Sequence, residues 1–353
     1  MRGFEHIRLC VKFNNEPSTY KAMEITDPRT VLDFQKTTFC GHVRAHVVKV
    51  LLQNIQLGHA DYSCYWSLEL LSSGLVHTLW MALFEASALH INRANPNVFL
   101  FLADAYEKYA PLEAAYNLRD MTQIRNNPDV RRMICEAAAT VALCRKNKLP
   151  NLPTIKPAHD FDPVTIQETI KAPSAIFGKL FLKRDDPMSI AIPINEFCYC
   201  LRPDVRDAGR ALYWMSWVYA FCREHKKQTK QTLTFSNRTD EFVSVAHGSH
   251  PAWLFWDCIR RQAQSHAKPY TDVLYKMYCL RWSQLGWLEA NAVPPMVRAT
   301  LTIRMCRSPF MVGASRRAKA QAMLRLQISH QHWQPCCKSG CRMELPGNRF
   351  KQS

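Results

Sequence analysis

Apolar residues recur along much of the chain at the spacing of an α-helix, and this period limits the folds open to it. One segment follows the i, i+3, i+4 rule without interruption, at Val98, Phe101, Leu102, Ala105, Tyr106 and Tyr109. Asn95 and Pro96 precede it, as a helix cap and a first-turn proline whose missing N–H costs no hydrogen bond. Asn127 and Pro128 repeat the arrangement. The sequence therefore predicts a mainly α fold built from helical bundle modules.

Two Tyr-Trp pairs mark similar points in two helical regions. They lie in "SCYWSLELL" (63–71) and "ALYWMSWVY" (211–219), each shortly after an aspartate, Asp61 or Asp207. Aromatic residues at helical spacing usually belong to a core, so we interpret both pairs as packing elements between helices. Similar segments follow each pair in the same order, which suggests a duplication. Chance similarity of helix caps is the alternative.

Changes in composition divide the chain into parts. Alternating apolar residues (Ile7, Leu9, Val11) are typical of a strand, and four prolines within 150–163 mark a boundary. The runs "AIFGKLFL" and "SIAIPINEFCYCL" fit either strands or buried helix turns, so minor mixed α/β segments are expected. The expected parts are a mixed strand/helix segment (1–56), a first helical module (57–149), a Pro-rich linker and mixed segment (150–206), a second helical module (207–290) and a basic, poorly ordered tail (291–353).

The charge balance indicates an anionic partner. The 353 residues carry a formal net charge of +17, and 291–353 hold eleven Lys/Arg against one acid, Glu344. Such asymmetry favours nucleic acid or an acidic surface; a solvated basic tail is the plainer alternative. No apolar stretch has the length of a signal peptide or a membrane span. We expect an intracellular protein of the cytoplasm or nucleus, or a virion component, with no membrane partner and with its fourteen cysteines reduced.

Two groups of basic residues are candidates for phosphate contact. In "REHKKQTKQ" (223–231) the helical period brings Arg223, Lys226, Lys227 and Lys230 to one flank. A solvated helix end is the alternative. The tail adds Arg316, Arg317 and Lys319. Neither group has the pattern of a recognition helix that reads base edges, so we expect binding without sequence preference.

Two further segments contain residues typical of metal or catalytic sites, but their spacing or expected secondary structure departs from the known motifs. "RPD" (202–204) and "EHK" (224–226) spell the PD-(D/E)-x-K pattern of metal-dependent nucleases. That pattern needs Glu224 and Lys226 on a strand, whereas both lie at an expected helix end, so a solvated helix end is favoured. The tail segment "HQHWQPCCKSGC" (330–341) offers five zinc ligands, but their spacing departs from paired C-x2-C motifs. We expect no cofactor and no catalytic residue, with zinc as the alternative, bound by His330, His332, Cys336, Cys337 and Cys341.

The first helical module resembles a known domain. Its aromatic helix start, the small-residue turn in "LELLSSG" and the "NP"-capped helices are similar to the helical collar that follows the ATPase core in clamp loaders and in replication-associated recombination ATPases. The resemblance covers 57–149, with a weaker echo at 207–285. In that family the collar holds subunits in a ring. The chain also resembles unassigned proteins of large DNA viruses.

The ATPase motor of that family has no counterpart in this sequence. The nearest match to G-x-x-x-x-G-K-[ST] is "PSAIFGKL" (173–180), where Pro173 replaces the first glycine and Leu180 replaces the Ser/Thr that binds magnesium. The resemblance thus implies a non-enzymatic, oligomer-forming scaffold for DNA replication or recombination. A virion structural protein and a metal-dependent nuclease are the alternatives.

Overall fold

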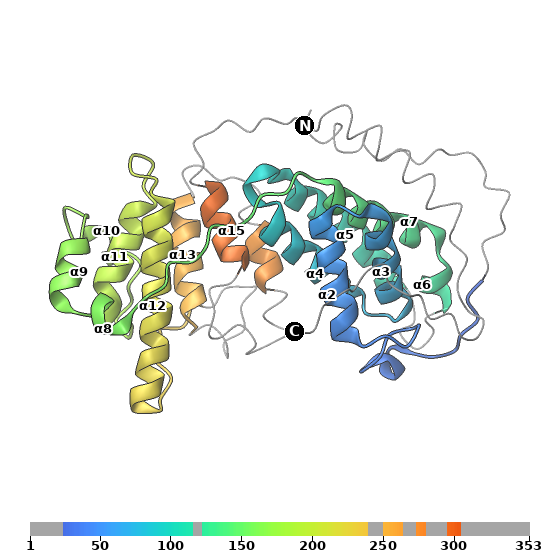
Figure 1. Ribbon diagram of the computed structural model, residues 1–353, viewed down its shortest axis with the longest axis horizontal. Coiled ribbons are helices and arrows are strands. Elements are labelled where there is room, and N and C mark those ends of the chain that lie inside the picture. The colour runs from blue at the N-terminus through green and yellow to red at the C-terminus, as the bar shows by residue number, and fades with distance from the viewer. Residues whose placement is uncertain (1–23, 116–121, 239–249, 264–272, 280–294, 305–353) are drawn as a thin grey trace, which may run out of the picture.

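The computed structural model describes residues 24–115, 122–238, 250–263, 273–279 and 295–304 (Figure 1). Within these ranges the regular structure is helical, apart from one isolated β-bridge between Thr37 and Val43. The predicted mainly α fold is confirmed. The two runs that could have been strands form helices instead, which are α10 (Ile176–Lys179), the 3-10 helix η3 (Met188–Ile190) and α11 (Ala191–Cys200). The strand expected at 7–13 lies outside the described residues.

The first bundle is larger than the sequence indicated. It contains α2 (Arg44–Leu57), α3 (Ala60–Ser72), α4 (Val76–His90), α5 (Asn97–Ala115), α6 (Thr122–Asn126) and α7 (Pro128–Leu143), with the 3-10 helices η1 (Val31–Phe34) and η2 (Asn92–Ala94). Because α2 packs on α3, α4 and α7, the expected boundary at residue 57 is wrong. Leu79 and Ile134 lie in the core, whereas Trp66 and Phe101 are only partly buried.

Local signals place several helix ends correctly. Gly58 ends α2 and Gly74 separates α3 from α4, both with positive φ. The side chain of Asn127 accepts hydrogen bonds from the backbone N–H groups of the first turn of α7, as predicted for a cap. Asn95 is different: α5 begins at Asn97, and the Asn95 amide donates to Cys144 Sγ at 3.4 Å. That predicted cap is wrong, because a contact 49 residues away holds the side chain.

The second bundle begins before the predicted boundary at residue 207. It comprises α8 (Pro157–Asp160), α9 (Pro163–Thr169), α10, α11, α12 (Ala208–Thr229), α13 (Pro251–Ala263) and a helical stretch at 273–279. Helix α8 packs on α12, where Asp160 accepts hydrogen bonds from Tyr213 Oη and, through its carbonyl oxygen, from Trp217 Nε1. The proline-rich segment therefore contributes to this bundle and is more than a linker.

Helix α15 (Pro295–Arg304) joins the two bundles. It contacts α4 and η2 on one side and α12 and α13 on the other, and it lies between them in Figure 1. Its apolar side chains are almost completely buried, at Met296, Val297, Ala299, Leu301 and Ile303. Residues 295–304 were expected in a poorly ordered tail, and that expectation is wrong for this helix. Residues 305–353 lie outside the described part of the chain.

The two Tyr-Trp pairs occupy unequal surroundings. Trp214 is fully buried, whereas Trp66 lies at the edge of the first bundle with its indole against the His42 ring. Helix α12 has 22 residues against 13 in α3, and no helix follows it within 231–238, where α4 would have its counterpart. Both Tyr-Trp pairs pack against neighbouring residues, in agreement with their interpretation as packing elements. The proposed duplication stays a prediction.

Candidate nucleic-acid interface

Helix α12 is packed along its first half and projects from the bundle along its second. Asp207 caps it by accepting from Arg210 N at 3.0 Å, and its buried residues all fall within 211–220. From Lys226 to its C-cap Lys230, every side chain of this helix end is exposed. Figure 1 shows this end of α12 extending past α8, α9 and α11. The projecting end is therefore reachable by a large partner.

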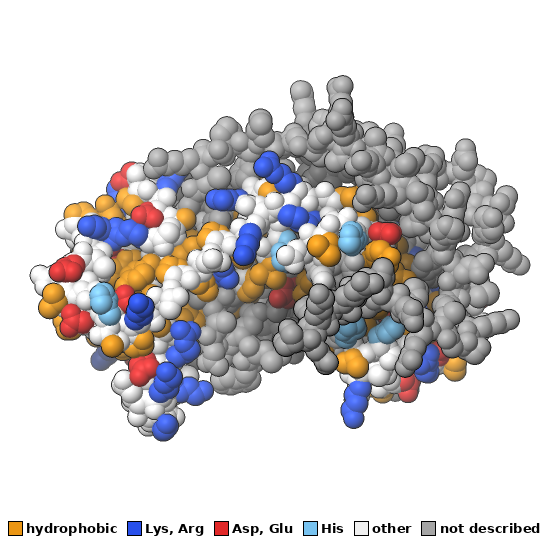
Figure 2. Space-filling view, in the orientation of Figure 1, with side chains coloured by type: hydrophobic (Ala, Val, Ile, Leu, Met, Phe, Trp, Pro, Cys, Tyr) orange, Lys and Arg blue, Asp and Glu red, His pale blue; other side chains and the backbone are white. Residues whose placement is uncertain are grey.

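The predicted basic flank lies on this projecting end. Arg223, Lys226, Lys227 and Lys230 are exposed and follow i, i+3, i+4, i+7 spacing, and Figure 2 shows Lys and Arg side chains gathered there. We call these four residues the basic strip. Glu224 is the acid in this stretch, and its Oε2 forms an ion pair with Lys227 Nζ at 3.3 Å. Cations near a helix C-terminus are also favoured by the helix dipole, which accounts for part of this pattern without a ligand.

The last residue of the strip ends the helix in a strained conformation. Lys230 is the C-cap with φ of 60°, in the left-handed region that glycine usually occupies, and its N–H donates to Lys226 O. A side chain in this region costs roughly 1 kcal/mol relative to glycine. The strained position thus carries a lysine in place of the residue that would best stabilise the turn.

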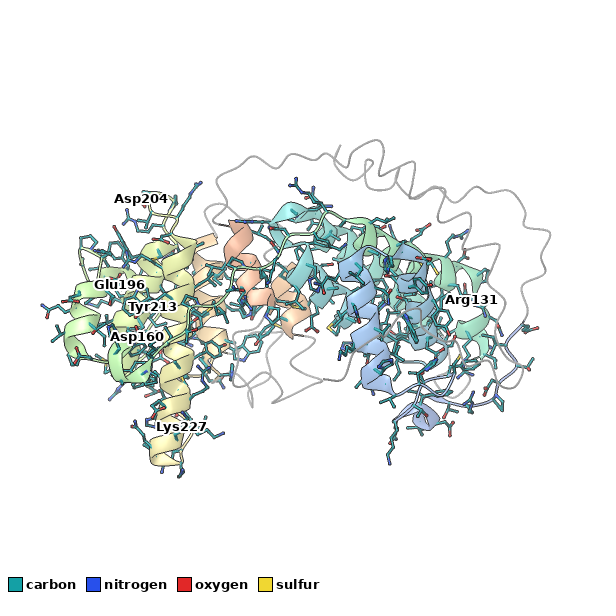
Figure 3. The ribbon with its side chains drawn as sticks, viewed as in Figure 1. Arg131, Asp160, Glu196, Asp204, Tyr213 and Lys227 are labelled. Carbon is teal, nitrogen blue, oxygen red and sulfur yellow. The ribbon has the colours of Figure 1, made fainter. Side chains whose placement is uncertain are left out.

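The nuclease pattern found in the sequence is not assembled in the structure. Asp204 lies before the start of α12 and pairs with Arg202, whereas Glu224 lies near the other end of the helix. Figure 3 shows Asp204 and Lys227 at opposite ends of α12. The 16 residue steps from Ala208 to Glu224 alone span about 24 Å at 1.5 Å per residue. These carboxylates cannot hold one magnesium ion, so this nuclease interpretation is wrong.

The buried carboxylates of the second bundle are occupied by structural hydrogen bonds. Glu196 accepts from the backbone N–H groups of Lys171 and Ala172 and from Arg210 Nη2, at 2.8 to 3.0 Å. Figure 3 places Glu196 and Asp160 on different elements beside α12. Glu196 joins α11 to the segment at 171–172, and Asp160 joins α8 to α12 through Tyr213. Their oxygens hold the fold together, and neither is set up as a general base.

The near match to a phosphate-binding loop has a packing role. Gly178 lies in the four-residue helix α10, and its N–H donates to Asn195 Oδ1 at 3.0 Å. A Cβ at this position would come within 2.8 Å of the Asn195 backbone, so the glycine is needed for the close approach of α10 to α11. The glycine in "GKL" is explained by packing alone.

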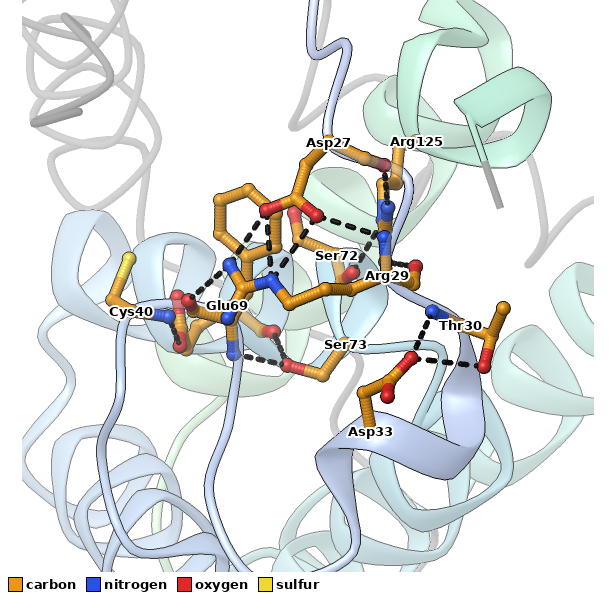
Figure 4. Close-up of polar contacts among 10 residues, drawn as sticks. Asp27, Arg29, Thr30, Asp33, Cys40, Glu69, Ser72, Ser73 and Arg125 are labelled. Atoms are coloured by element: carbon orange, nitrogen blue, oxygen red, sulfur yellow. Dashed lines mark hydrogen bonds and ion pairs between the residues drawn. The ribbon is translucent and has the colours of Figure 1, made fainter. Parts of the chain in front are cut away.

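A buried arginine organises the start of the described chain. Arg125 donates to three carbonyl oxygens, those of Ser72, Asp27 and Arg29, at 2.6 to 2.7 Å (Figure 4). Its guanidinium lies over the Phe34 ring, as does that of Arg29, which also pairs with Asp27. Charge-assisted bonds to carbonyls fix segment 25–30 against the end of α3. The arrangement holds the backbone in place.

Burial shifts the pKa values of two cysteines and one lysine in the bundles. Burial raises the pKa of the Cys200 and Cys222 thiols to about 12, so both are protonated at neutral pH. Burial also lowers the pKa of Lys146 to about 8, but its amine already donates to the carbonyls of Val141, Ala142 and Cys144. None of the nine described cysteines forms a disulfide.

Several predicted site residues cannot be placed. Arg316, Arg317 and Lys319, and the zinc candidates His330, His332, Cys336, Cys337 and Cys341, lie outside the described residues. Within the described ranges, no group of three or more His, Cys, Asp or Glu side chains is arranged to hold a metal ion. No helix in the same ranges is long and apolar enough to span a membrane.

The structure adds charged residues that the sequence interpretation missed. Two of these interactions connect segments separated by 50 residues or more. One is the set of hydrogen bonds from Arg125, and the other is the buried ion pair of Asp186 with Arg238. No local pattern marks such residues, because a buried arginine and an exposed one look alike in sequence. Comparison with known proteins gives no further guide: no family model, curated protein or solved structure matches the chain.

Proposed function

We propose that the protein is a non-enzymatic helical scaffold that binds nucleic acid without sequence preference. It acts within an assembly of DNA replication or recombination, with a role like that of a clamp-loader collar. The observation that carries the proposal is the basic strip on the projecting end of α12. Arg223, Lys226, Lys227 and Lys230 lie on one flank, are exposed, and stand clear of the packed body.

The geometry of the strip suits a phosphate backbone. Lysine ammonium groups are point charges that contact phosphates without reading bases, and releasing the condensed counterions drives binding. Successive positions along one helix flank reach more than one phosphate at a time. The single nearby acid, Glu224, is held by Lys227 and Gln228, which limits its repulsion of an approaching strand.

The state of the other ionisable groups favours binding over catalysis. Glu196 and Asp160 have their oxygens occupied by backbone and side-chain donors, and the buried thiol of Cys200 is protonated. The bundle α2–α7, with its 57–149 collar resemblance, is the candidate for contacts between subunits or with protein partners. The basic residues of 305–353, nine Lys/Arg and one acid, would add a second, nonspecific contact.

The test compares two triple variants that remove the same charge. Lys226, Lys227 and Lys230 are changed to Gln in one, and three exposed lysines elsewhere, at positions 36, 49 and 156, are changed to Gln in the other. Binding to several duplexes of unrelated sequence is followed by fluorescence anisotropy. The strip variant should bind every duplex about tenfold or more weakly, and by a similar factor for each. Equal affinity in the two variants would refute the proposed interface.

A further inference from the structure

A second cationic site lies in the other half of the same bundle, away from the basic strip. A cleft of about 190 Å³ opens between the loop at 183, the end of the extended segment at 238, helix α13 and the helical stretch at 273–279. Four cations and one carboxylate line it, together with three aromatic rings; these are Lys183, Arg238, Arg260, Arg261, Asp257, Trp253, Trp256 and Tyr275. The charge of the lining is therefore positive.

One of these cations is fixed in the floor of the cleft. The Arg238 side chain is 5% exposed and makes a bidentate ion pair with Asp186, whose side chain is 1% exposed. Its guanidinium also donates to the carbonyl oxygens of Ser236 and Phe181. Asp186 neutralises this arginine, and the other cations of the lining are Lys183, Arg260 and Arg261. Asp257 offsets one of them, because its Oδ1 accepts from Arg261 Nε at 2.6 Å.

The floor still holds hydrogen-bond donors that have no acceptor among the described residues. Arg238 Nε lies 3.7 Å from Asp257 Oδ2, beyond hydrogen-bond reach, and Trp256 Nε1 is buried without a partner. Buried donors of this kind are costly unless an acceptor satisfies them. They also add positive potential beneath the cleft, which favours an anion above it.

The exposure of the lining side chains decides which kind of anion fits. Trp253, Trp256 and Tyr275 are only 1 to 4% exposed, so they offer no open face on which a nucleobase could stack. The accessible groups are the heads of Lys183 and Arg261, with Arg260 half-buried over the Tyr275 ring at 3.9 Å. The volume is below the roughly 300 Å³ at which pockets enclose drug-sized molecules. A compact oxyanion needs no open aromatic face and fits the small volume of the cleft.

We propose that this cleft is a phosphate-binding site, with Lys183, Arg260 and Arg261 as its direct ligands and Arg238 and Trp256 beneath them. The phosphate comes either from a free anion or from the backbone of a nucleic-acid strand. Guanidinium and ammonium donors bind the oxygens by charge-assisted hydrogen bonds. The Asp257 carboxylate competes with phosphate for Arg261, because it accepts the hydrogen bond of Arg261 Nε that a bound phosphate would accept.

Titration calorimetry on the full chain tests the site, with inorganic phosphate and a short single-stranded oligonucleotide as separate probes. Lys183→Gln and Arg261→Gln should each weaken binding by about fivefold or more, as expected for one charge-assisted contact. Asp257→Asn should tighten binding, because it removes the competing charge while keeping the side-chain shape. Trp256→Phe tests the indole N–H and should weaken binding by a smaller factor.

Control variants keep this site separate from the basic strip. Gln at Lys226, Lys227 and Lys230 should leave phosphate binding unchanged, so the two proposals can fail independently. Variant-sensitive binding of phosphate identifies a free-anion site, and variant-sensitive binding of the oligonucleotide alone identifies the strand backbone. The proposal is overturned if neither probe binds, or if Lys183→Gln and Asp257→Asn leave the affinity of both unchanged.

Discussion

Replacing Leu301 with Ala tests whether α15 holds the two bundles together. Leu301 is fully buried in a helix that contacts α4 and η2 of the first bundle and α12 and α13 of the second. Truncation of a buried leucine removes apolar contacts and leaves a cavity that the surrounding helices fill only in part. The expected loss is about 2–5 kcal/mol of unfolding free energy. The substitution should lower the stability of both bundles, because α15 packs against each of them.

Differential scanning calorimetry and urea unfolding measure this loss. A change of 1 kcal/mol shifts Tm by about 2–4 °C in domains of 150–250 residues, so Leu301→Ala should lower Tm by roughly 5–15 °C. Leu57→Ala is the matched control, because Leu57 is 59% exposed at the end of α2 and should cost less than about 0.5 kcal/mol. Equal Tm values for the two variants would refute the placement of α15.

The structure carries three further predictions. Arg125→Met leaves three carbonyl oxygens without a donor and should cost roughly 3 kcal/mol or more in urea unfolding, whereas the exposed Arg132→Met should cost little. Lys230→Gly should stabilise the protein by about 1 kcal/mol by relieving its positive φ, and Lys230→Gln should not. Burial raises the pKa of Asp186, but hydrogen bonds from Arg238 and from backbone N–H groups outweigh burial and place it below the ordinary 3.8. The unfolded state then binds more protons, so stability should fall as pH drops below about 4, and Asp186→Asn should remove that component.

Local signals account for what the sequence predicted correctly. The apolar period and the cap at Asn127 each depend on residues within one or two turns. The same holds for the basic strip, whose common flank needs only that 223–229 be helical. Trp66 shows the limit, since an apolar face does not say how far neighbouring helices cover it.

Long-range packing accounts for what the sequence did not predict. Helix α15 lies between two bundles and is buried at positions 296, 297, 299, 300, 301 and 303, which at 100° per residue cover more than half of its circumference. Its basic surroundings in 291–353 then suggested a tail. The cleft near Asp257 was missed because its lining comes from four separate segments. These contacts depend on the assembled fold.

This correction changes how the tail should be tested. Removing 291–353 would delete α15 and destabilise the protein, so a truncation that asks about charge must keep residues 1–304. The 49 residues beyond hold nine Lys/Arg and one acid, a net of +8. The chain 1–304 retains the basic strip and both bundles.

The salt dependence of duplex binding tests the central claim most directly. Each phosphate contact contributes about −0.9 to the slope of log K against log salt. The full chain should have the steepest slope, 1–304 a shallower one, and 1–304 with Gln at Lys226, Lys227 and Lys230 a slope smaller again by up to about 2.7. If the three slopes are equal, or if the full chain binds duplex with no dependence on salt, the proposed nucleic-acid interface is wrong.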